Sequence, residues 1–101
     1  MNDGKLISVV MASNRVDEYL CLAVNSMLKQ SYKYIELIFV ANGNDAKIVS
    51  EFLSKNIQDP RLKIIETPIG QLSFSLNLGI SHACGDYIAR MDADDISLPN
   101  R

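Results

Sequence analysis

The sequence predicts an α/β fold with a mainly parallel sheet, because strand-like and helix-like segments alternate along its 101 residues. Four mostly apolar segments with strand character fall at residues 6–11, 35–40, 62–66 and 87–91. Three segments with apolar residues at helical spacing lie between them. Their short connections favour right-handed crossovers between parallel strands. The expected order is therefore β-α-β-α-β-α-β.

The first strand and helix are predicted from a switch in periodicity. Residues 6–11 are nearly all apolar, which suits a strand covered on both faces. Apolar residues three and four apart then indicate a helix, with Asn14 or Asp17 as its candidate cap. The apolar stripe of this helix is Leu20, Val24, Met27 and Leu28.

The second strand and helix are joined by a polar turn. After the strand at residues 35–40, Gly43 is free to take a positive φ. Asn44 or Asp45 is expected to cap the helix that follows. The apolar stripe of that helix is Ile48, Val49, Phe52 and Leu53.

The second half of the chain repeats the alternation. A third strand at residues 62–66 is followed by a helix that begins after Gly70. Four residues spaced four apart are expected to share one face of this helix: Leu72, Leu76, Ile80 and Cys84. Gly85 is expected to end it as a left-handed cap. The fourth strand, at residues 87–91, is expected to be buried.

The composition is that of one ordinary globular domain. Hydrophobic residues make up 48% and charged residues 22%, so residues 1–101 are expected to form a single domain. The net charge of −2 argues against nucleic-acid binding, which needs a basic face. No apolar run approaches the ~20 residues of a membrane span, and the first residues lack a signal-peptide pattern. We therefore expect a cytoplasmic protein.

The two cysteines and the histidine are expected to have no chemical role. Cys21 and Cys84 belong to no CxxC motif, and a structural disulfide is not expected in the cytosol. Both are therefore predicted to be small core residues. His82 and Cys84 lie two apart on a predicted helix and face different sides, which argues against a zinc site.

Three carboxylates, those of Asp92, Asp94 and Asp95, follow the fourth predicted strand. Crowded carboxylates repel one another unless a cation or hydrogen-bond donors compensate them. Mg²⁺ or Mn²⁺ is the natural partner, because these ions take oxygen ligands and leave positions open for phosphates. The plainer alternative is an acidic turn in solvent. An EF-hand loop is excluded, because the required Gly and Glu do not follow.

Three polar loops follow predicted strands, at residues 11–15, 41–44 and 92–95. In open parallel α/β sheets, ligands bind beyond the carboxyl ends of the strands. We therefore expect these loops to form a metal-dependent site for a phosphate-containing ligand. A phosphatase-like or receiver-like Mg²⁺ domain is a competing interpretation, but it needs a carboxylate after an earlier strand. Residues 12–14 and 41–42 contain none.

Several ordered motifs carry a family resemblance, at residues 8–20, 30–32, 36–40, 77–80, 83–89 and 91–95. Together they resemble the family 2, GT-A-fold glycosyltransferases, whose most specific run ends in a DxD motif. The likeness is greatest to bacterial capsule and O-antigen transferases, which often carry Arg-Met-Asp-Ala-Asp-Asp followed by Pro and Arg. Here Arg90, Pro99 and Arg101 fill those places.

The resemblance implies a Rossmann-like three-layer α/β/α domain, the N-terminal half of a GT-A fold. It also implies an inverting glycosyltransferase that uses a nucleoside diphosphate sugar. Asp92, Asp94 and Asp95 match the region that binds the nucleotide ribose and a divalent cation, Mg²⁺ or Mn²⁺. Asp94 and Asp95 are the first choices as metal ligands, and Asp92 and Asp94 as nucleotide-sugar contacts. The ion would neutralise charge on the leaving diphosphate.

Two departures from the family pattern bear on the nucleotide. Where the family has an aromatic residue with polar neighbours that help hold the base, this chain has Ala12, Ser13 and Asn14. Where the family has paired acidic residues, the second of which pairs with the uracil imide, this chain has Ala41 and Asn42. Asn42 can accept an N–H through its amide oxygen, but it can also donate. A UDP-sugar is the leading donor, and another nucleotide is allowed.

Two further polar residues have alternative roles. By its motif Asn77 is a nucleotide-sugar contact, and a satisfied buried amide is the alternative. Arg90 shares a strand face with Asp92. Arg90 could form an ion pair with an Asp, which is the simpler role, and the more specific alternative is a contact with the diphosphate of the ligand.

The resemblance places the general base downstream of the acidic motif, so no catalytic residue is assigned here. The chain is expected to stop before the acceptor half and to be inactive alone. The full-length protein would serve a saccharide or lipid-linked acceptor in bacterial surface polysaccharide synthesis, with peripheral association at the inner face of the membrane allowed. The alternative is a non-catalytic nucleotide-binding module.

Overall fold

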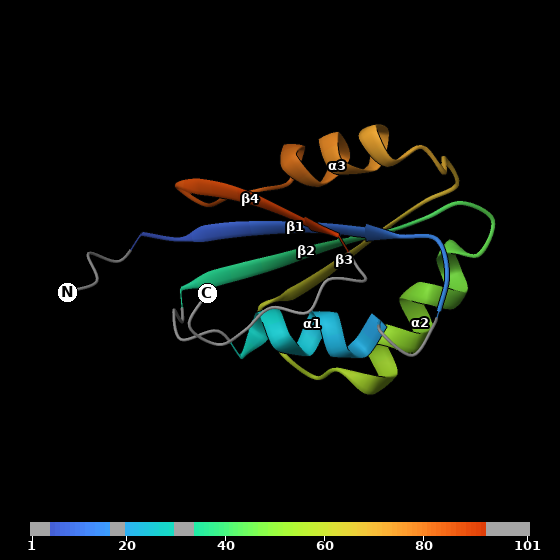
Figure 1. The fold of residues 1–101 in the computed structure, drawn as a ribbon, viewed down its shortest axis with the longest axis horizontal. Helices are drawn as coiled ribbons and strands as arrows, with labels where there is room; N and C mark the ends of the chain where they lie inside the picture. The colour runs from blue at the N-terminus through green and yellow to red at the C-terminus, as the bar shows by residue number, and fades with distance from the viewer. Residues whose placement is uncertain (1–4, 17–19, 30–33, 93–101) are drawn as a thin grey trace.

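The computed structural model describes residues 5–16, 20–29 and 34–92, with Met91 and Asp92 described by their backbone alone. Within these residues strands and helices alternate in the predicted order (Figure 1). The elements are β1 Ile7–Ser13, α1 Leu20–Leu28, β2 Ile35–Asn42, α2 Ala46–Asn56, β3 Leu62–Thr67, α3 Leu72–Ser81 and β4 Tyr87–Asp92. The predicted α/β fold class is confirmed.

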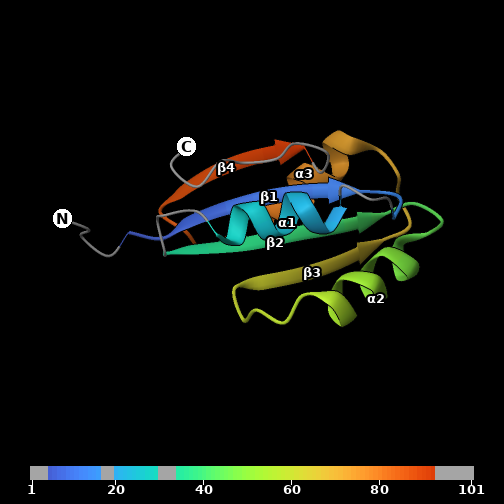
Figure 2. The same ribbon diagram turned by 60° about the horizontal axis from the view of Figure 1, so that its bottom comes forward.

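In the described part of the chain, a four-stranded parallel sheet in the order β3-β2-β1-β4 forms the middle layer (Figure 2). The chain builds the sheet from β1 to β3 in one direction and then returns to place β4 on the other side of β1. The register pairs Ser13 with Ala41, and Ala12 with Asp92. Because all strands are parallel, their carboxyl ends lie at one edge of the sheet, and the strand order reverses at β1.

Helices α1 and α2 cover one face of the sheet, and α3 covers the other (Figure 1). The face under α1 and α2 carries the hydrophobic core, in which side chains of β1 and β2 pack against both helices. Its members include Val9, Met11, Leu37, Phe39, Leu20, Val24, Val49 and Leu53. Ile48 of the predicted stripe is exposed, because it lies beside Val49 on the solvent side of α2. None of the described helices is long and apolar enough to cross a membrane.

The packing face of α3 differs from the prediction. Leu72, one of the four residues expected to share it, is 53% exposed, whereas Ser75 and Gly79 are buried. A Cβ added at Gly79 would lie 2.5 Å from Val10 Cγ1, so a residue without a Cβ is needed for the helix to lie this close to the sheet. Small residues, not leucines, therefore define the face that packs on the sheet.

The connection from α3 to β4 also differs from the prediction. Helix α3 ends at Ser81, so Cys84 lies in a loop and is exposed rather than in the core. Both cysteines are free thiols in the structure. Gly85 does not have the positive φ of a left-handed cap. Among the described residues only Gly43, with a φ of 83°, takes that conformation, and this agrees with the prediction.

Strand β4 forms where predicted, but it is not buried. Tyr87 is 58% exposed and Ile88 is 48% exposed. Among the described strands β4 pairs with β1 alone, and α3 contacts β1 and β2 instead. The side chain of Arg90, whose position is in register with Val10, is exposed for the same reason.

Candidate functional site

The carboxyl edge of the sheet brings the ends of β1, β2 and β4 together (Figure 2). Ala12 lies between Val40 of β2 and Asp92 of β4 in the register. Asn42, at the last position of β2, is in register with Thr67 of β3. The predicted meeting of these strand ends is therefore observed, and we call this region the carboxyl edge.

An open polar pocket of about 390 Å³ lies at the carboxyl edge. It is lined by residues from the loops after β1, β2 and β3: Asn14, Gly43, Asn44, Asp45, Pro68 and Gly70. Asp45 takes the predicted N-cap position of α2, but its side chain makes no capping hydrogen bond. The pocket is thus bordered by amide and carboxylate side chains, which suit a polar ligand.

Asn42 is a buried polar side chain near this pocket. It is 4% exposed, and its Nδ2 donates a hydrogen bond to Ser75 Oγ of α3 over 2.7 Å. Its Oδ1 is buried and has no hydrogen-bond partner among the described residues. A buried acceptor without a partner is costly, because water is lost and nothing replaces it. The amide therefore offers an acceptor that an N–H donor would satisfy.

The loop between β3 and α3 lies against the end of β2. The Gly43 N–H donates to Thr67 O over 3.0 Å, and the Ile69 N–H donates to Thr67 Oγ1 over 3.2 Å. A Cβ added at Gly70 would lie 3.7 Å from the Gly43 Cα. These contacts make this loop a wall of the pocket.

Most of the predicted nucleotide-sugar residues lie together. Those at the carboxyl edge are Ala12, Ser13, Asn14, Asn42 and Asp92. Ser13 Oγ also bonds the backbone of Arg15, donating to its carbonyl and accepting from its N–H, which shapes the loop after β1. Asp94 and Asp95 lie outside the described residues, so the structure gives no geometry for them.

Asn77 does not join this group. It is exposed, and it lies about half a turn from both Ser75 and Gly79, the residues of α3 that are buried on the sheet. Its side chain therefore leaves α3 on the side away from the sheet. The alternative of a satisfied buried amide is wrong.

The predicted metal ligands can be tested only by the chemistry of the donor set. Within the described part of the chain, no group of three or more His, Cys, Asp or Glu residues could hold a metal ion. Asp92 ends β4 at the carboxyl edge, and the sequence continues with Asp94 and Asp95. Three carboxylates are the oxygen donors that Mg²⁺ and Mn²⁺ prefer, so the residues fit such an ion.

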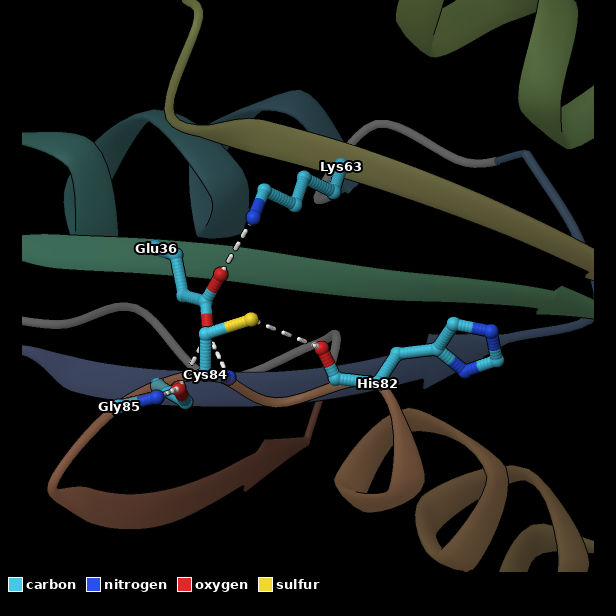
Figure 3. A network of polar contacts seen from close by, with 6 residues as sticks. Glu36, Lys63, His82, Cys84 and Gly85 are labelled. Carbon is cyan, nitrogen blue, oxygen red and sulfur yellow. Dashed lines mark hydrogen bonds and ion pairs between the residues drawn. The ribbon is translucent and has the colours of Figure 1, made fainter.

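A second polar cluster lies at the opposite, amino end of the sheet (Figure 3). Glu36 of β2 is 4% exposed, and its Oε2 accepts a short hydrogen bond from Ser8 Oγ and another from the Cys84 N–H over 2.6 Å. Its Oε1 accepts from Lys63 Nζ over 2.6 Å. Ser8 Oγ in turn accepts from the Gly85 N–H over 2.8 Å. We call these five residues the Glu36 cluster.

The Glu36 cluster keeps its carboxylate ionised. Burial alone would raise the pKa of Glu36, but the hydrogen bonds from Lys63, Ser8 and the Cys84 backbone, with the charge of Lys63, outweigh it. The pKa of Glu36 is therefore lowered. The pKa of Lys63 is raised, first by its hydrogen bond to Glu36 and then by the carboxylate charge. The ring of His82 takes no part, since it points away from the carboxylate in Figure 3, and only the His82 carbonyl oxygen joins the network, by accepting from Cys84 Sγ over 3.8 Å.

The Glu36 cluster fixes the start of β4. Its acceptors bind the two backbone N–H groups just before the strand, those of Cys84 and Gly85. A Cβ at Gly85 would lie 2.5 Å from Ser8 Oγ, so this close approach, not a left-handed φ, explains the glycine. The Asp86 N–H then donates to Leu6 O over 2.7 Å. The register of β4, and with it the position of Asp92, follows from this anchor.

Two functional contacts were not found from the sequence. Ser75, which accepts a hydrogen bond from Asn42, lies in α3, and the leucine spacing of α3 predicted a different buried face. The sequence places Glu36 in a predicted strand and in a family motif, and neither predicts its hydrogen bonds. A signal for it existed, because Ser8 and Glu36 are polar residues at the same place in two otherwise apolar strands, and the register pairs them.

A family model matches almost the whole chain: Glycosyl transferase family 2, over residues 8–101. The O-antigen biosynthesis glycosyltransferase WbnJ from Escherichia coli is 44% identical over 97 residues, which cover 95% of this chain and 38% of WbnJ. The chain therefore spans less than half the length of this curated relative.

Two solved structures share the fold. The mannosyltransferase PcManGT from Pyrobaculum calidifontis, in complex with GDP-Man and Mn²⁺, matches with a TM-score of 0.76 at 16% identity, over 91% of this chain and 28% of that one. S. aureus TarS 1-349, in complex with UDP-GlcNAc, matches with a TM-score of 0.70 at 20% identity, over 90% of this chain and 27% of that one. The predicted GT-A type of fold is confirmed.

Proposed function

Because the chain belongs to glycosyl transferase family 2, we propose that it is the donor- and metal-binding part of an inverting glycosyltransferase. The donor is a nucleoside diphosphate sugar, with a UDP-sugar as the leading candidate. The whole protein transfers the sugar to a saccharide or lipid-linked acceptor of bacterial surface polysaccharide synthesis. The O-antigen role in the name of WbnJ supports this choice of acceptor.

One observation carries the proposal: the buried Oδ1 of Asn42, an acceptor without a hydrogen-bond partner, lies at the edge where β1, β2 and β4 end. A nucleobase with a ring N–H would satisfy that buried oxygen. The ends of β1 and β4 lie side by side there, with Ala12 in register with Asp92. A ligand that combines a base with phosphates fits this combination, with the base at the acceptor and the phosphates held through a cation at the acidic run that begins with Asp92.

Each residue of the carboxyl edge has a proposed role. Asn42 contacts the base, and Asn14 lines the polar pocket at the same edge. Ala12 and Ser13 are small, so they leave space for the base and ribose over the end of β1. Asp92 contacts the nucleotide sugar. Asn77 is left out of the proposal, because it lies on the far side of α3 from the sheet.

The acidic run supplies the proposed metal site. Asp94 and Asp95 would hold Mg²⁺ or Mn²⁺, and Asp94 would also contact the nucleotide sugar. The bound ion supplies charge neutralisation on the departing nucleoside diphosphate. The Mn²⁺ and GDP-Man complex of PcManGT and the UDP-GlcNAc complex of TarS support a donor and a metal of this kind.

No residue of this chain is proposed as the general base. The pocket is lined by amides, glycines, a proline and one carboxylate, that of Asp45, which lies at the start of α2 on the β2 side of the edge. A base must reach the acceptor hydroxyl, and we assign it to the remainder of a longer protein. The chain on its own therefore binds the donor without transferring the sugar.

Titration calorimetry tests this proposal. UDP, GDP and dTDP are titrated into the chain with and without Mn²⁺, and then into the variants Asp94→Ala and Glu51→Ala. Glu51 is an exposed carboxylate on α2, so its variant is the matched control. We expect a nucleotide to bind with Mn²⁺ and to bind at least roughly tenfold more weakly without the ion or in Asp94→Ala.

The control variant should bind as the unchanged chain does. If none of the three nucleotides binds with Mn²⁺ present, the proposed function is wrong. If binding is the same in Asp94→Ala as in Glu51→Ala, the role given to the acidic run is wrong.

A further inference from the structure

We propose that Ser75 is a positioning residue that sets which nucleobase the site accepts. It holds the Asn42 amide so that the carbonyl oxygen is its free atom, and the site therefore selects bases that carry a ring N–H. This inference rests on the proposed function, because it concerns the base of the donor. Ser75 belongs to none of the sequence motifs described above, and it does not lie at the end of a strand.

The position of Ser75 relative to the sheet is fixed by packing. Ser75 is fully buried, and its N–H donates to Gln71 O over 3.0 Å within the first turn of α3. One turn later Gly79 brings the helix backbone against Val10. The helix therefore cannot move closer to the sheet. The 2.7 Å hydrogen bond from Asn42 Nδ2 then ends on an oxygen that is held in place.

The opposite orientation of the Asn42 amide is less favourable. It would turn the NH₂ group toward the buried position that Oδ1 occupies without a partner. Buried N–H groups without a partner are rarer than carbonyl oxygens without one, because each oxygen has two lone pairs and tolerates partial satisfaction. The Ser75 hydroxyl can accept or donate. When it accepts from Nδ2 it satisfies one N–H of the amide, whereas donating to Oδ1 would leave both N–H groups of Asn42 without a partner. Ser75 thus favours the orientation with Oδ1 free.

An amide held in one orientation can bind only a base whose ring nitrogen is a hydrogen-bond donor. Uracil, thymine and guanine present a ring N–H, which can donate to Oδ1. Cytosine and adenine present a ring nitrogen lone pair at the corresponding atom, which would face the oxygen with no proton between them. An asparagine that could turn over would donate to that lone pair and accept both kinds of base. The discrimination therefore depends on the serine that prevents the turn.

Oδ1 is fully covered in this structure, so a base contacts it only after the surrounding chain opens slightly. Such an opening is compatible with selection, because a buried hydrogen bond rejects a wrong partner more strongly than an exposed one. The discrimination between bases should then be larger than a surface asparagine would give.

The test measures base discrimination in the full chain with Mn²⁺ present. Dissociation constants are measured for UDP, CDP and N3-methyl-UDP, whose methyl group replaces the ring proton. The variants are Ser75→Ala, Ser75→Thr and Asn42→Asp, together with the double variant of Asn42→Asp and Ser75→Ala. Ser73→Ala, an exposed serine of α3, is the matched control.

We expect the unchanged chain and Ser73→Ala to prefer UDP over both other ligands by roughly tenfold or more. In Ser75→Ala the preference for UDP over CDP should fall to within about threefold, mainly because CDP binds more tightly once the amide can turn. Ser75→Thr keeps the hydroxyl and should restore the preference. In Asn42→Asp both oxygens accept, so adding Ser75→Ala should leave the UDP to CDP ratio unchanged.

A purely structural role for Ser75 would weaken UDP and CDP binding alike, and an unchanged ratio in Ser75→Ala would overturn the inference. If Ser75→Ala does not fold, the test is made on the unchanged chain. Equal dissociation constants for UDP and N3-methyl-UDP would then overturn the inference as well. In both cases UDP still binds, so the proposed function stands. If no nucleotide binds the unchanged chain, the proposed function and this inference fail together.

Discussion

Glu36 shows how one buried carboxylate can organise a loop. Its two oxygens accept three hydrogen bonds, from Ser8, Lys63 and the Cys84 backbone. A buried charge is tolerated when such donors replace the lost water. Glu36 is the shared acceptor of these three donors, so its loss leaves more groups without a partner than the loss of any one donor. Lys63 is exposed, so water can reach its ammonium group.

Replacement of Glu36 should therefore destabilise the protein much more than replacement of Lys63. We expect Glu36→Ala to lower the free energy of unfolding by about 3 kcal/mol, because the Ser8 hydroxyl and the Cys84 N–H lose their acceptor. Lys63→Ala should lower it by less, because the Lys63 side chain is about half exposed and water can take its place at Glu36 Oε1. Urea unfolding of both variants measures the two values, and equal losses would show that the ion pair, not the buried acceptor, dominates.

The stability of the protein should fall in acid because of Glu36 and Asp59. The pKa of Glu36 is lowered for the reasons given above, and the pKa of Asp59 is lowered mainly by the hydrogen bond from Arg61. A carboxyl whose pKa is lower in the folded state stabilises the protein above its unfolded pKa, about pH 4, and this stabilisation is lost as the pH falls further.

Urea unfolding between about pH 6 and pH 3 checks this dependence. In Glu36→Gln, the loss of stability over this range should be smaller than in the unchanged chain, because one of the two carboxyls no longer titrates. An identical dependence on pH in both proteins would mean that Glu36 does not have a lowered pKa.

At the scale of elements, the four strands and three helices were predictable because each has a clear local pattern. The periodicities of α1 and α2 also predicted their buried faces, since Val24, Val49 and Leu53 are in the core. The face of α3 was not predictable in this way. Its leucine spacing predicted another face, and the close packing at Gly79 depends on Val10 of a distant strand, which local spacing cannot reveal.

Gly79→Ala tests the packing of α3. Alanine favours helix by about 1 kcal/mol over glycine, but here its Cβ would overlap Val10 and press on Val40. We expect a net loss of about 1–2 kcal/mol in the free energy of unfolding, because overpacking outweighs propensity.

Thermal or urea unfolding measures this loss, and adding Val10→Ala to Gly79→Ala should recover part of it by making space. Ser73→Ala, an exposed change on the same helix, should have little effect. A stabilised Gly79→Ala protein would show that α3 does not lie as close to β1 as described.

At the scale of the whole molecule, the sheet separates two polar ends. The Glu36 cluster at the amino end fixes where β4 begins, and the carboxyl edge brings together Ala12, Asn42 and Asp92. The position of the site could be predicted, because parallel strands in an alternating α/β chain end at one edge. The Ser75 hydrogen bond could not, because it joins residues that are 33 positions apart and depends on how closely α3 packs.

The central claim is that the carboxyl edge binds a nucleoside diphosphate. An NMR titration of the ¹⁵N-labelled chain with UDP and Mg²⁺ tests it most directly, because backbone amides report where a ligand binds. The account expects saturable shifts for residues 12–14 and 42–45, and for Asp92, while the amides of Ser8, Cys84 and Gly85 at the amino end stay in place. Saturable shifts confined to the amino end, or no shifts at any concentration of UDP, would contradict the account.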